Sequence, residues 1–282
     1  MSGKIVLVTG ASSGIGMAIA KEFVEKGFKV FGTSRNAEKT EIEQSGGYSL
    51  LSLDITDDSS RKNCVDKILK TEGRIDILVN NAGYGQMGAL MDLPGEKFEK
   101  QLQTNLVGPA ALTQLVVPSM IQNKSGMVVN ISSISGVMPS AFAGAYSSSK
   151  AAMNAWSDTL RVELKPFNIK VITVQPGAIQ SNFGNSAAQN LAFAEEKSSY
   201  APIADFIHRR ALISQEGATP AEVFARKLVN QLIKKHPKAI IRLGKSSFVY
   251  PFLKRWLPVA VLDGIISRKF GLKMLEQMRK TH

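Results

Sequence analysis

The sequence predicts an α/β protein in which a doubly wound parallel sheet carries helices on both faces. Two observations favour this fold class. Short apolar runs alternate with segments of helical periodicity, and the short connections between them require right-handed crossovers between parallel strands. With 282 residues and 44% hydrophobic content, the chain is long enough for one well-buried domain and too short for two large ones.

The amino-terminal part reads as strand, helix, strand, strand, helix, strand. The strands are expected at residues 4–10, 29–35, 48–54 and 75–80, and the helices at 14–27 and about 57–70. Gly27 follows the first helix and is expected to cap its carboxyl end, because glycine adopts the left-handed conformation that ends many helices.

The carboxyl-terminal part continues the alternation. Helices are expected at about 95–122, 146–165 and 219–236, and strands at 126–133, 169–177 and 238–242. Thr219 with Glu222 three residues later has the pattern of a capping box. We therefore predict one Rossmann-type domain.

The predicted domain organisation has three parts. Residues 1–243 form the cofactor-binding and catalytic domain, and 244–282 form a basic, aromatic helical extension packed on it. Within the domain, the mixed polar stretch 178–216 follows a sheet strand, which favours a substrate lid over an ordinary surface insertion.

Composition narrows the class of protein. No apolar run is long enough to span a bilayer, and a strand begins close to Met1, so a cytoplasmic protein is expected. The single cysteine, Cys64, lies in a helical pattern and is expected to be a packed thiol. Three scattered histidines predict no metal site. The net charge of +12 suits an anionic ligand or surface without choosing one.

Thr9 to Gly16, TGASSGIG, lie where the first strand turns into the first helix. Glycines there permit a tight turn and let backbone N–H groups approach a pyrophosphate at the positive end of the helix. The motif therefore predicts a dinucleotide site.

The end of the second strand indicates which dinucleotide is bound. A carboxylate there would accept the ribose hydroxyls of NAD, whereas this chain has Ser34, Arg35 and Asn36. Because an arginine can pair with a 2′-phosphate, we favour NADP(H) as the cofactor and keep NAD(H) as the alternative.

Tyr146 and Lys150 are four residues apart in AYSSSKAAMNAW, so they share one face of the predicted helix. A tyrosine has an ordinary pKa of about 10, and a neighbouring lysine cation favours its phenolate. The pair therefore suits proton transfer, and Ser133 at the end of the preceding strand could hold a substrate oxygen.

Together these motifs resemble the short-chain dehydrogenase/reductase family, and the resemblance covers roughly the first 180 residues. The matching segments are TGASSGIG, Asp54 in LDIT, the NNAG of residues 80–83, Asn105, Ser133, Tyr146, Lys150 and Pro176-Gly177, in the family's order. The resemblance implies Ser133, Tyr146, Lys150 and Asn105 as catalytic residues. Lys150 would also hold the nicotinamide ribose, and Asn105 would hold a water that links Lys150 to solvent.

The resemblance also implies a cofactor site. Its expected residues are Gly10, Ser12, Ser13, Gly14, Ile15, Gly16, Ser34, Arg35, Asn36, Asp54, Ile55, Asn81, Ala82, Gly83, Tyr146, Lys150, Pro176 and Gly177. Such domains commonly pair through their fourth and fifth helices, so a homodimer or homotetramer is expected.

The tail is similar to those of the branch with acyl-dihydroxyacetone-phosphate reductases and steroid or retinol dehydrogenases. It favours a bulky apolar carbonyl or alcohol as substrate. Aromatic residues alternate there with lysines and arginines, which suits a lid with a basic rim, a helix lying on anionic lipid, or plain packing.

Two alternatives belong to other classes. A non-catalytic NADP-binding sensor or scaffold would not need the serine, tyrosine and lysine that this chain keeps. Nucleic-acid binding is suggested by the charge alone, with no binding motif, and is not expected.

Overall fold

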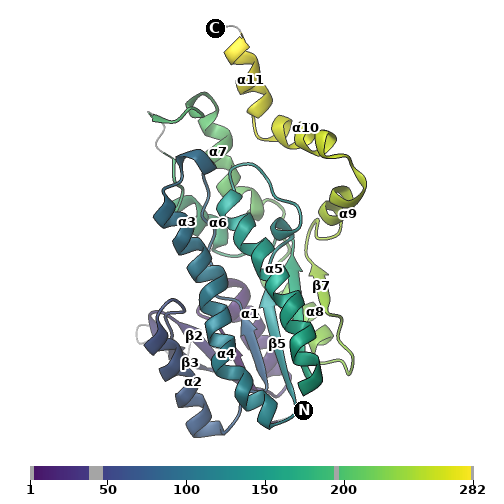
Figure 1. The fold of residues 1–282 in the computed structure, drawn as a ribbon. Coiled ribbons are helices and arrows are strands. Elements are labelled where there is room, and N and C mark those ends of the chain that lie inside the picture. The colour runs from purple at the N-terminus through teal and green to yellow at the C-terminus, as the bar shows by residue number, and fades with distance from the viewer. Residues whose placement is uncertain (1–2, 38–46, 194–196, 281–282) are drawn as a thin grey trace.

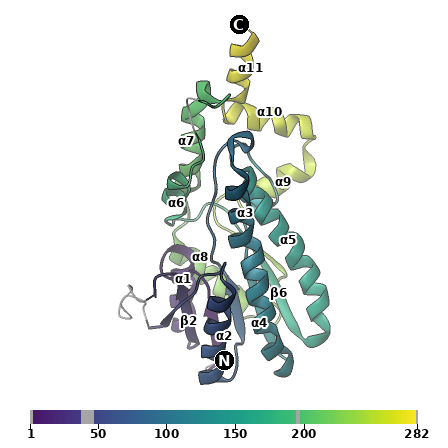
Figure 2. The ribbon, with the colours of Figure 1, turned by 60° about the vertical axis from the view of Figure 1, so that its left-hand side comes forward.

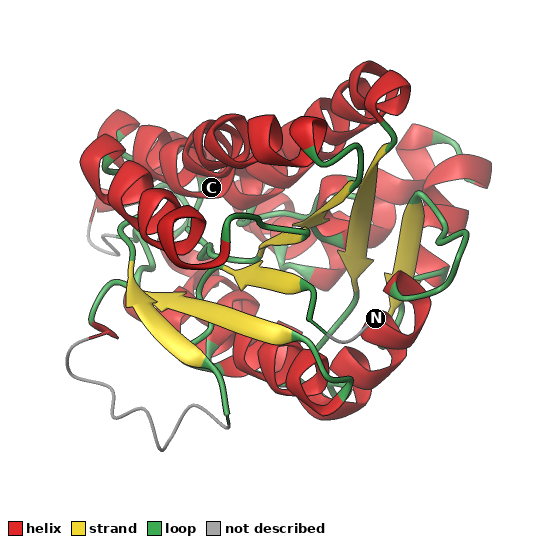
Figure 3. Ribbon diagram, turned by 90° about the horizontal axis from the view of Figure 1, so that it is seen from below, coloured by secondary structure: helices red, strands yellow, loops and turns green. Residues whose placement is uncertain are grey.

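The computed structural model describes residues 3–37, 47–193 and 197–280. Its seven parallel strands form one sheet in the order β3-β2-β1-β4-β5-β6-β7. Their bounds are β1 Ile5–Val8, β2 Lys29–Ser34, β3 Ser49–Ser52, β4 Ile77–Asn80, β5 Gly126–Ile131, β6 Ile169–Pro176 and β7 Ile240–Leu243. The sheet lies between two layers of helices (Figure 3). The predicted fold class is confirmed.

One face of the sheet is covered by α1 (Gly14–Glu25) and α8 (Ala221–Leu232). Phe23 of α1 and Phe224 of α8 are buried in a single core with Val6, Val8 and other strand residues. The helical period places these aromatic rings on the sheet side of their helices, so apolar burial fixes both helices on this face.

The other face is covered by α2 (Asp58–Glu72), α4 (Gly108–Gln122) and α5 (Gly144–Leu164). Cys64 lies in this second core, where burial raises the pKa of its thiol to about 11. The cysteine is therefore a packing residue, as the sequence predicts.

The strand order reverses between β1 and β4. The chain passes outward from β1 to β2 and β3 and then returns to place β4 on the other side of β1. The connecting segments therefore diverge at the carboxyl ends of β1 and β4, which leaves a crevice where ligands bind in open α/β sheets.

The opposite end of the sheet is fastened by Asp76, which is buried. Its carboxylate accepts a hydrogen bond of 2.8 Å from the Ile5 amide and forms an ion pair with Arg74. One carboxylate thus links the beginnings of β1 and β4 on the side away from the crevice, which stabilises the register of the two strands.

One local prediction, at the start of α8, is corrected. Helix α8 begins at Ala221 with Pro220 as its N-cap, and no side chain caps it, so the predicted capping box of Thr219 and Glu222 is wrong. Thr219 instead forms a bridge with Ile179, and its backbone bonds to Ala178 and Gln180. The strand-like pairing takes Thr219 out of the helix.

The predicted helix at 95–122 consists of α3 (Gly95–Leu102), a π-helical segment (Gln103–Val107) and α4. Single π turns inside α-helices often occur at functional sites.

The stretch 178–216, predicted as a substrate lid, contains α6 (Phe183–Gln189) and α7 (Ala204–Leu212).

The last helices are α9 (Val249–Trp256), α10 (Val259–Lys269) and α11 (Leu272–Lys280). They extend beyond the carboxyl end of the sheet on the side of α6 and α7 (Figures 1 and 2). Phe270, just after α10, and Leu275 of α11 are buried there against Phe142 and Ile207, so α10 and α11 pack on α7 and on the loop after β5.

Candidate active site

A pocket of about 1400 Å³ opens at the carboxyl ends of β1, β2, β4, β5 and β6. Every residue predicted to bind cofactor lines it, as do Ser133, Tyr146 and Lys150. Asn105 does not line the pocket and is buried behind it.

The glycine-rich turn forms one end of this pocket. Gly10 and Gly14 have φ of +65° and +54°, which favours glycine. A Cβ at Gly16 would lie 2.2 Å from the Gly10 carbonyl oxygen, so the first turn of α1 can pack there only without a side chain. Ser13, the N-cap of α1, makes no side-chain cap and the first turn holds no acid, which suits an anionic ligand.

Thr9 and Asn81 hold this turn in place. The Thr9 hydroxyl accepts from the Asn81 and Ala82 amides, each at 2.9 Å. The Asn81 side chain donates in return to the carbonyls of Thr9 and Gly10, at 2.9 and 3.1 Å. The asparagine of the NNAG motif therefore fixes the shape of the glycine turn on the neighbouring strand.

The end of β2 lies beside the same turn. The Ala11 amide donates to the Thr33 carbonyl at 2.8 Å, and the Tyr48 hydroxyl donates to the Ala11 carbonyl at 2.6 Å. Arg35 follows β2 and is exposed at the pocket, near Asp54. Hydrogen bonds from Thr56 chiefly lower the pKa of Asp54, with smaller effects of the Arg35 and Arg61 charges.

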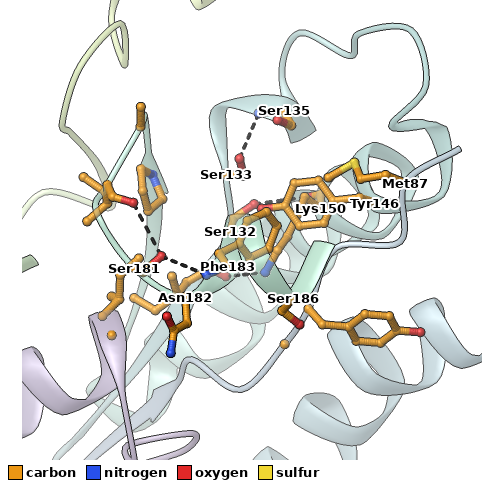
Figure 4. Close-up of a pocket in the computed structure, with 18 of the residues that line it drawn as sticks. Met87, Ser132, Ser133, Ser135, Tyr146, Lys150, Ser181, Asn182, Phe183 and Ser186 are labelled. Carbon is orange, nitrogen blue, oxygen red and sulfur yellow. Dashed lines mark hydrogen bonds between the residues drawn. The ribbon is translucent and has the colours of Figure 1, made fainter. Parts of the chain in front are cut away.

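The other end of the pocket holds Ser133, Tyr146 and Lys150 (Figure 4). Lys150 is buried, and its Nζ donates to the Ile131 carbonyl at 2.7 Å. Burial lowers the pKa of Lys150 to about 8, because the charged form loses hydration. The Lys150 Nζ lies 5.9 Å from the centre of the Tyr146 ring, so the two side chains face one region of the pocket.

Burial raises the pKa of Tyr146 above its ordinary value, while a hydrogen bond with Ser133 and the charge of Arg210 act in the opposite direction. The sequence predicts Lys150 as the cation that favours the phenolate. That role of Lys150 stays a prediction, and the charge of Arg210, which belongs to α7, also favours the phenolate. The arrangement can hold a protonated phenol at neutral pH and stabilise the phenolate when the proton leaves.

Asn105 lies in the π-helical segment between α3 and α4. Its amide group donates to the Tyr84 carbonyl at 3.0 Å and to Ser149 Oγ at 3.1 Å, and it accepts from the Tyr84 amide. Ser149 in turn donates to the Tyr146 carbonyl at 2.7 Å. Asn105 is thus joined to the backbone of α5 at Tyr146, whereas its predicted water link to Lys150 stays a prediction.

The remaining wall comes from the stretch 178–216 and from α9 and α10. Phe183 of α6 lies 5.2 Å from Tyr146 between ring centres, and Arg210 of α7 and Tyr250 of α9 also line the pocket. Sequence reasoning missed Phe183 and Arg210, and it covered Tyr250 only as one of the aromatic residues of the tail that could form a lid. A signal existed for Arg210, because Ile203, Ile207 and Ala211 are spaced so that they share its helical face.

Comparison with known proteins agrees with this geometry. The short chain dehydrogenase family model matches residues 4–192. A "3-ketodihydrosphingosine reductase" of Bacteroides thetaiotaomicron is 35% identical over 269 residues, which cover 92% of this chain and 94% of that protein.

Solved structures show the same likeness. A short-chain dehydrogenase from Streptomyces avermitilis has a TM-score of 0.79 at 32% identity and covers 100% of this chain and 99% of its own. A metagenomic short-chain oxidoreductase in complex with NADP has a TM-score of 0.59 at 35% identity and covers 63% of this chain and 83% of its own. With a serine, tyrosine and lysine at one end of the pocket and a glycine turn at the other, the chain belongs to the short-chain dehydrogenase/reductase family and is an oxidoreductase that acts on CH–OH groups.

Proposed function

We propose that the protein is an NADP(H)-dependent oxidoreductase that interconverts a carbonyl and an alcohol on a bulky apolar substrate, with Tyr146 as general acid and base. The observation that carries this proposal is that one pocket is lined both by Ser133, Tyr146 and Lys150 and by the glycine turn. Bound NADPH would supply the hydride for reduction.

Each side chain has a distinct part in the proton transfer. Ser133 donates a hydrogen bond to the substrate oxygen and holds it beside Tyr146. Tyr146 gives its proton to that oxygen as negative charge develops there. Because burial raises the pKa of Tyr146, the phenol is protonated at neutral pH, and the Arg210 charge stabilises the phenolate that remains.

Lys150, with a pKa of about 8, is largely protonated at neutral pH and would hold the ribose hydroxyls. Asn105 acts as a positioning residue, because it joins Tyr84 to Ser149 and through it to the Tyr146 backbone.

Two features support NADP(H) as the cofactor: the amino terminus of α1 at the glycine turn, and Arg35. The uncapped amino terminus of α1 suits a pyrophosphate. Arg35 is the residue at the pocket's edge whose guanidinium suits a 2′-phosphate, and the 35%-identical neighbour is named as an NADP complex.

The substrate proposal rests on the pocket's apolar wall. Leu253, Ile266 and Phe270 of the C-terminal helices line the pocket together with Phe206 and Ile213. The relative named 3-ketodihydrosphingosine reductase has a name that describes reduction of a keto group, which supports a keto compound here.

We also propose that α9 and α10 lie on an anionic membrane surface. Phe252 and Trp256 are 63% and 66% exposed, and Lys254 and Arg255 stand beside them in the same short helix. None of the helices in the described part of the chain is long and apolar enough to span a bilayer. Exposed aromatic residues beside cations suit a helix in the interface, and the anionic cytoplasmic leaflet favours a location at that surface.

The proposed assembly is a homodimer or homotetramer formed through α4 and α5. Leu115 of α4 and Val162 of α5 are exposed on the outer layer of helices. We expect light scattering to give at least twice the mass of one chain at micromolar concentration. Val162→Asp should lower that mass, whereas Val223→Asp, at an exposed apolar residue of α8, should not. A wild-type mass of one chain would contradict the assembly.

Replacing Tyr146 by Phe tests the reaction. We expect kcat for carbonyl reduction to fall by about 10²- to 10⁴-fold, because the proton donor is lost. NADPH oxidation should be measured across steroid, retinoid, acyl-lipid and small ketone or aldehyde substrates. Tyr84→Phe removes another hydroxyl from the pocket lining and should change kcat less than about threefold. Turnover by Tyr146→Phe at the wild-type rate would show that the mechanism is wrong.

Replacing Arg35 by Asp tests the cofactor. We expect KM for NADPH to rise by about 10- to 100-fold, with a much smaller change for NADH, because only NADPH carries the phosphate that the guanidinium would bind. Arg226→Asp makes the same charge change at an exposed residue of α8 outside the pocket lining and serves as control. Equal effects on both cofactors would overturn the preference.

The membrane proposal is tested by replacing Phe252 and Trp256 with Ser. Both side chains are exposed, so the fold should persist and flotation with phosphatidylserine-rich vesicles should be lost. Deleting 244–282 is a poorer test, because it also removes Phe270 and Leu275 from a buried core. Wild-type protein that fails to float with such vesicles would rule the proposal out.

A further inference from the structure

Arg210 is a buried cation in the wall of the substrate pocket. It projects from α7, is 7% exposed, and lines the pocket together with Tyr146. Its Nε donates to Ser140 Oγ at 3.1 Å, and its guanidinium carbon lies 5.9 Å from the centre of the Phe270 ring. The side chain is therefore held in place from two sides.

The charge of Arg210 has no partner of opposite sign in the part of the chain that the structure describes. Its neighbour Arg209 forms an ion pair with Glu216 at 3.4 Å, and no carboxylate among the described residues lies within ion-pair distance of Arg210. An arginine has five N–H donors, and the hydrogen bond to Ser140 uses one of them. The terminal nitrogens thus retain their donors for a ligand.

The other buried arginine shows the contrast. Arg61 is 4% exposed, but it forms an ion pair with Asp58 and donates to the Ile55 carbonyl at 2.6 Å. Burying an unpaired cation is unfavourable, because the charge loses water and gains no compensating group. Paired Arg61 is explained by the fold, whereas unpaired Arg210 is not.

The surroundings of Arg210 favour an anion further. Lys269, whose Nζ lies 5.8 Å from the centre of the same Phe270 ring, lines the pocket, as does Lys245. Among the described residues the carboxylates in the lining are Glu216 and Asp54, and Asp54 lies near Arg35. Glu216 already pairs with Arg209, and its backbone carbonyl accepts from Lys245. The apolar side chains of Phe206, Ile213 and Ile266 complete this wall.

We infer that Arg210 binds an anionic group of the substrate, a carboxylate or a phosphate monoester, while Tyr146 serves the carbonyl of the same molecule. The planar guanidinium can donate two parallel hydrogen bonds to either anion. The substrate class is thus an oxo acid or oxo phosphate with an apolar remainder. This inference rests on the proposed carbonyl reduction and narrows its substrate.

Binding is tested without turnover. Protein saturated with NADP⁺, which blocks the site near Arg35, is titrated calorimetrically with decanoate, decyl phosphate and decanol. We expect one or both anions to bind the wild type about 10- to 100-fold more tightly than decanol, as for a buried charged hydrogen-bonded pair. Whichever anion shows the preference identifies the group.

Three variants assign that preference. Arg210→Met should abolish the preference for an anion and leave the affinity for decanol unchanged. Arg210→Lys should keep part of the preference. Arg209→Gln should change the preference less than about twofold, because Arg209 is exposed and already paired. Arg210→Met should not lower Tm, since it removes an unpaired buried charge. Equal binding of anions and decanol by the wild type, or an unchanged preference in Arg210→Met, would refute the inference. So would a lowered Tm with equal losses for all three ligands.

Turnover separates this inference from the proposed reaction. Oxodecanoates with the keto group at different positions are compared with their methyl esters as NADPH-dependent substrates. We expect the acid-to-ester ratio of kcat/KM to fall by about 10- to 100-fold in Arg210→Met. Equal losses of kcat for acid and ester would mean that Arg210 acts only on the ionisation of Tyr146, and would overturn the proposed anion site. If the protein reduces no carbonyl compound but still binds anions in a way that depends on Arg210, the proposed reaction is contradicted and the anion site is supported.

Discussion

The rest of the site depends on the hydrogen-bonded junction between the ends of β1 and β4. Thr9 and Asn81 exchange side-chain bonds with each other's backbone across two parallel strands. These strands are adjacent because the sheet order reverses there, and Asp76 fixes their other ends. A turn rich in glycine has little conformational preference of its own. Its shape is imposed by the neighbouring strand, so the cofactor end of the pocket is only as rigid as this junction.

A second polar network performs the same task at the catalytic end. Asn80 donates to Asn130 at 2.8 Å, and Asn130 donates to Ser157 on α5 at 2.9 Å, all of them buried. Most buried amides are hydrogen-bonded, and bonded ones favour a single packing; among the described residues the Asn80 Oδ1 atom is the exception in this network, because it has no partner. Helix α5 is therefore oriented by a hydrogen bond from Asn130 of β5, which is itself bonded to Asn80 of β4, as well as by its apolar face. It carries Tyr146 and Lys150 in that orientation.

The sequence predicts the sheet, its helices and the residues at the cofactor end of the pocket because these depend on local signals. Apolar period, glycine spacing and the order of motifs are all visible in one dimension, and every predicted cofactor residue lines the pocket. Thr219 shows where local signals mislead, because its hydroxyl suits a helix cap but its backbone pairs with Ala178. Arg210 could not be assigned, because Ser140, Phe270 and Tyr146 meet it only through tertiary packing.

The C-terminal helices connect the pocket with the exposed aromatic surface. In α9, Tyr250 and Leu253 line the pocket, whereas Phe252 and Trp256 face outward. Phe270, just after α10, packs with Ile207 of α7 and lies beside Arg210. An apolar substrate that leaves a bilayer at this surface would therefore cross a single layer of helix to reach Tyr146. The same helices would contact lipid and form the pocket lining around Arg210. A change in their position at a membrane would therefore alter substrate binding, while the Thr9–Asn81 junction would stay unchanged.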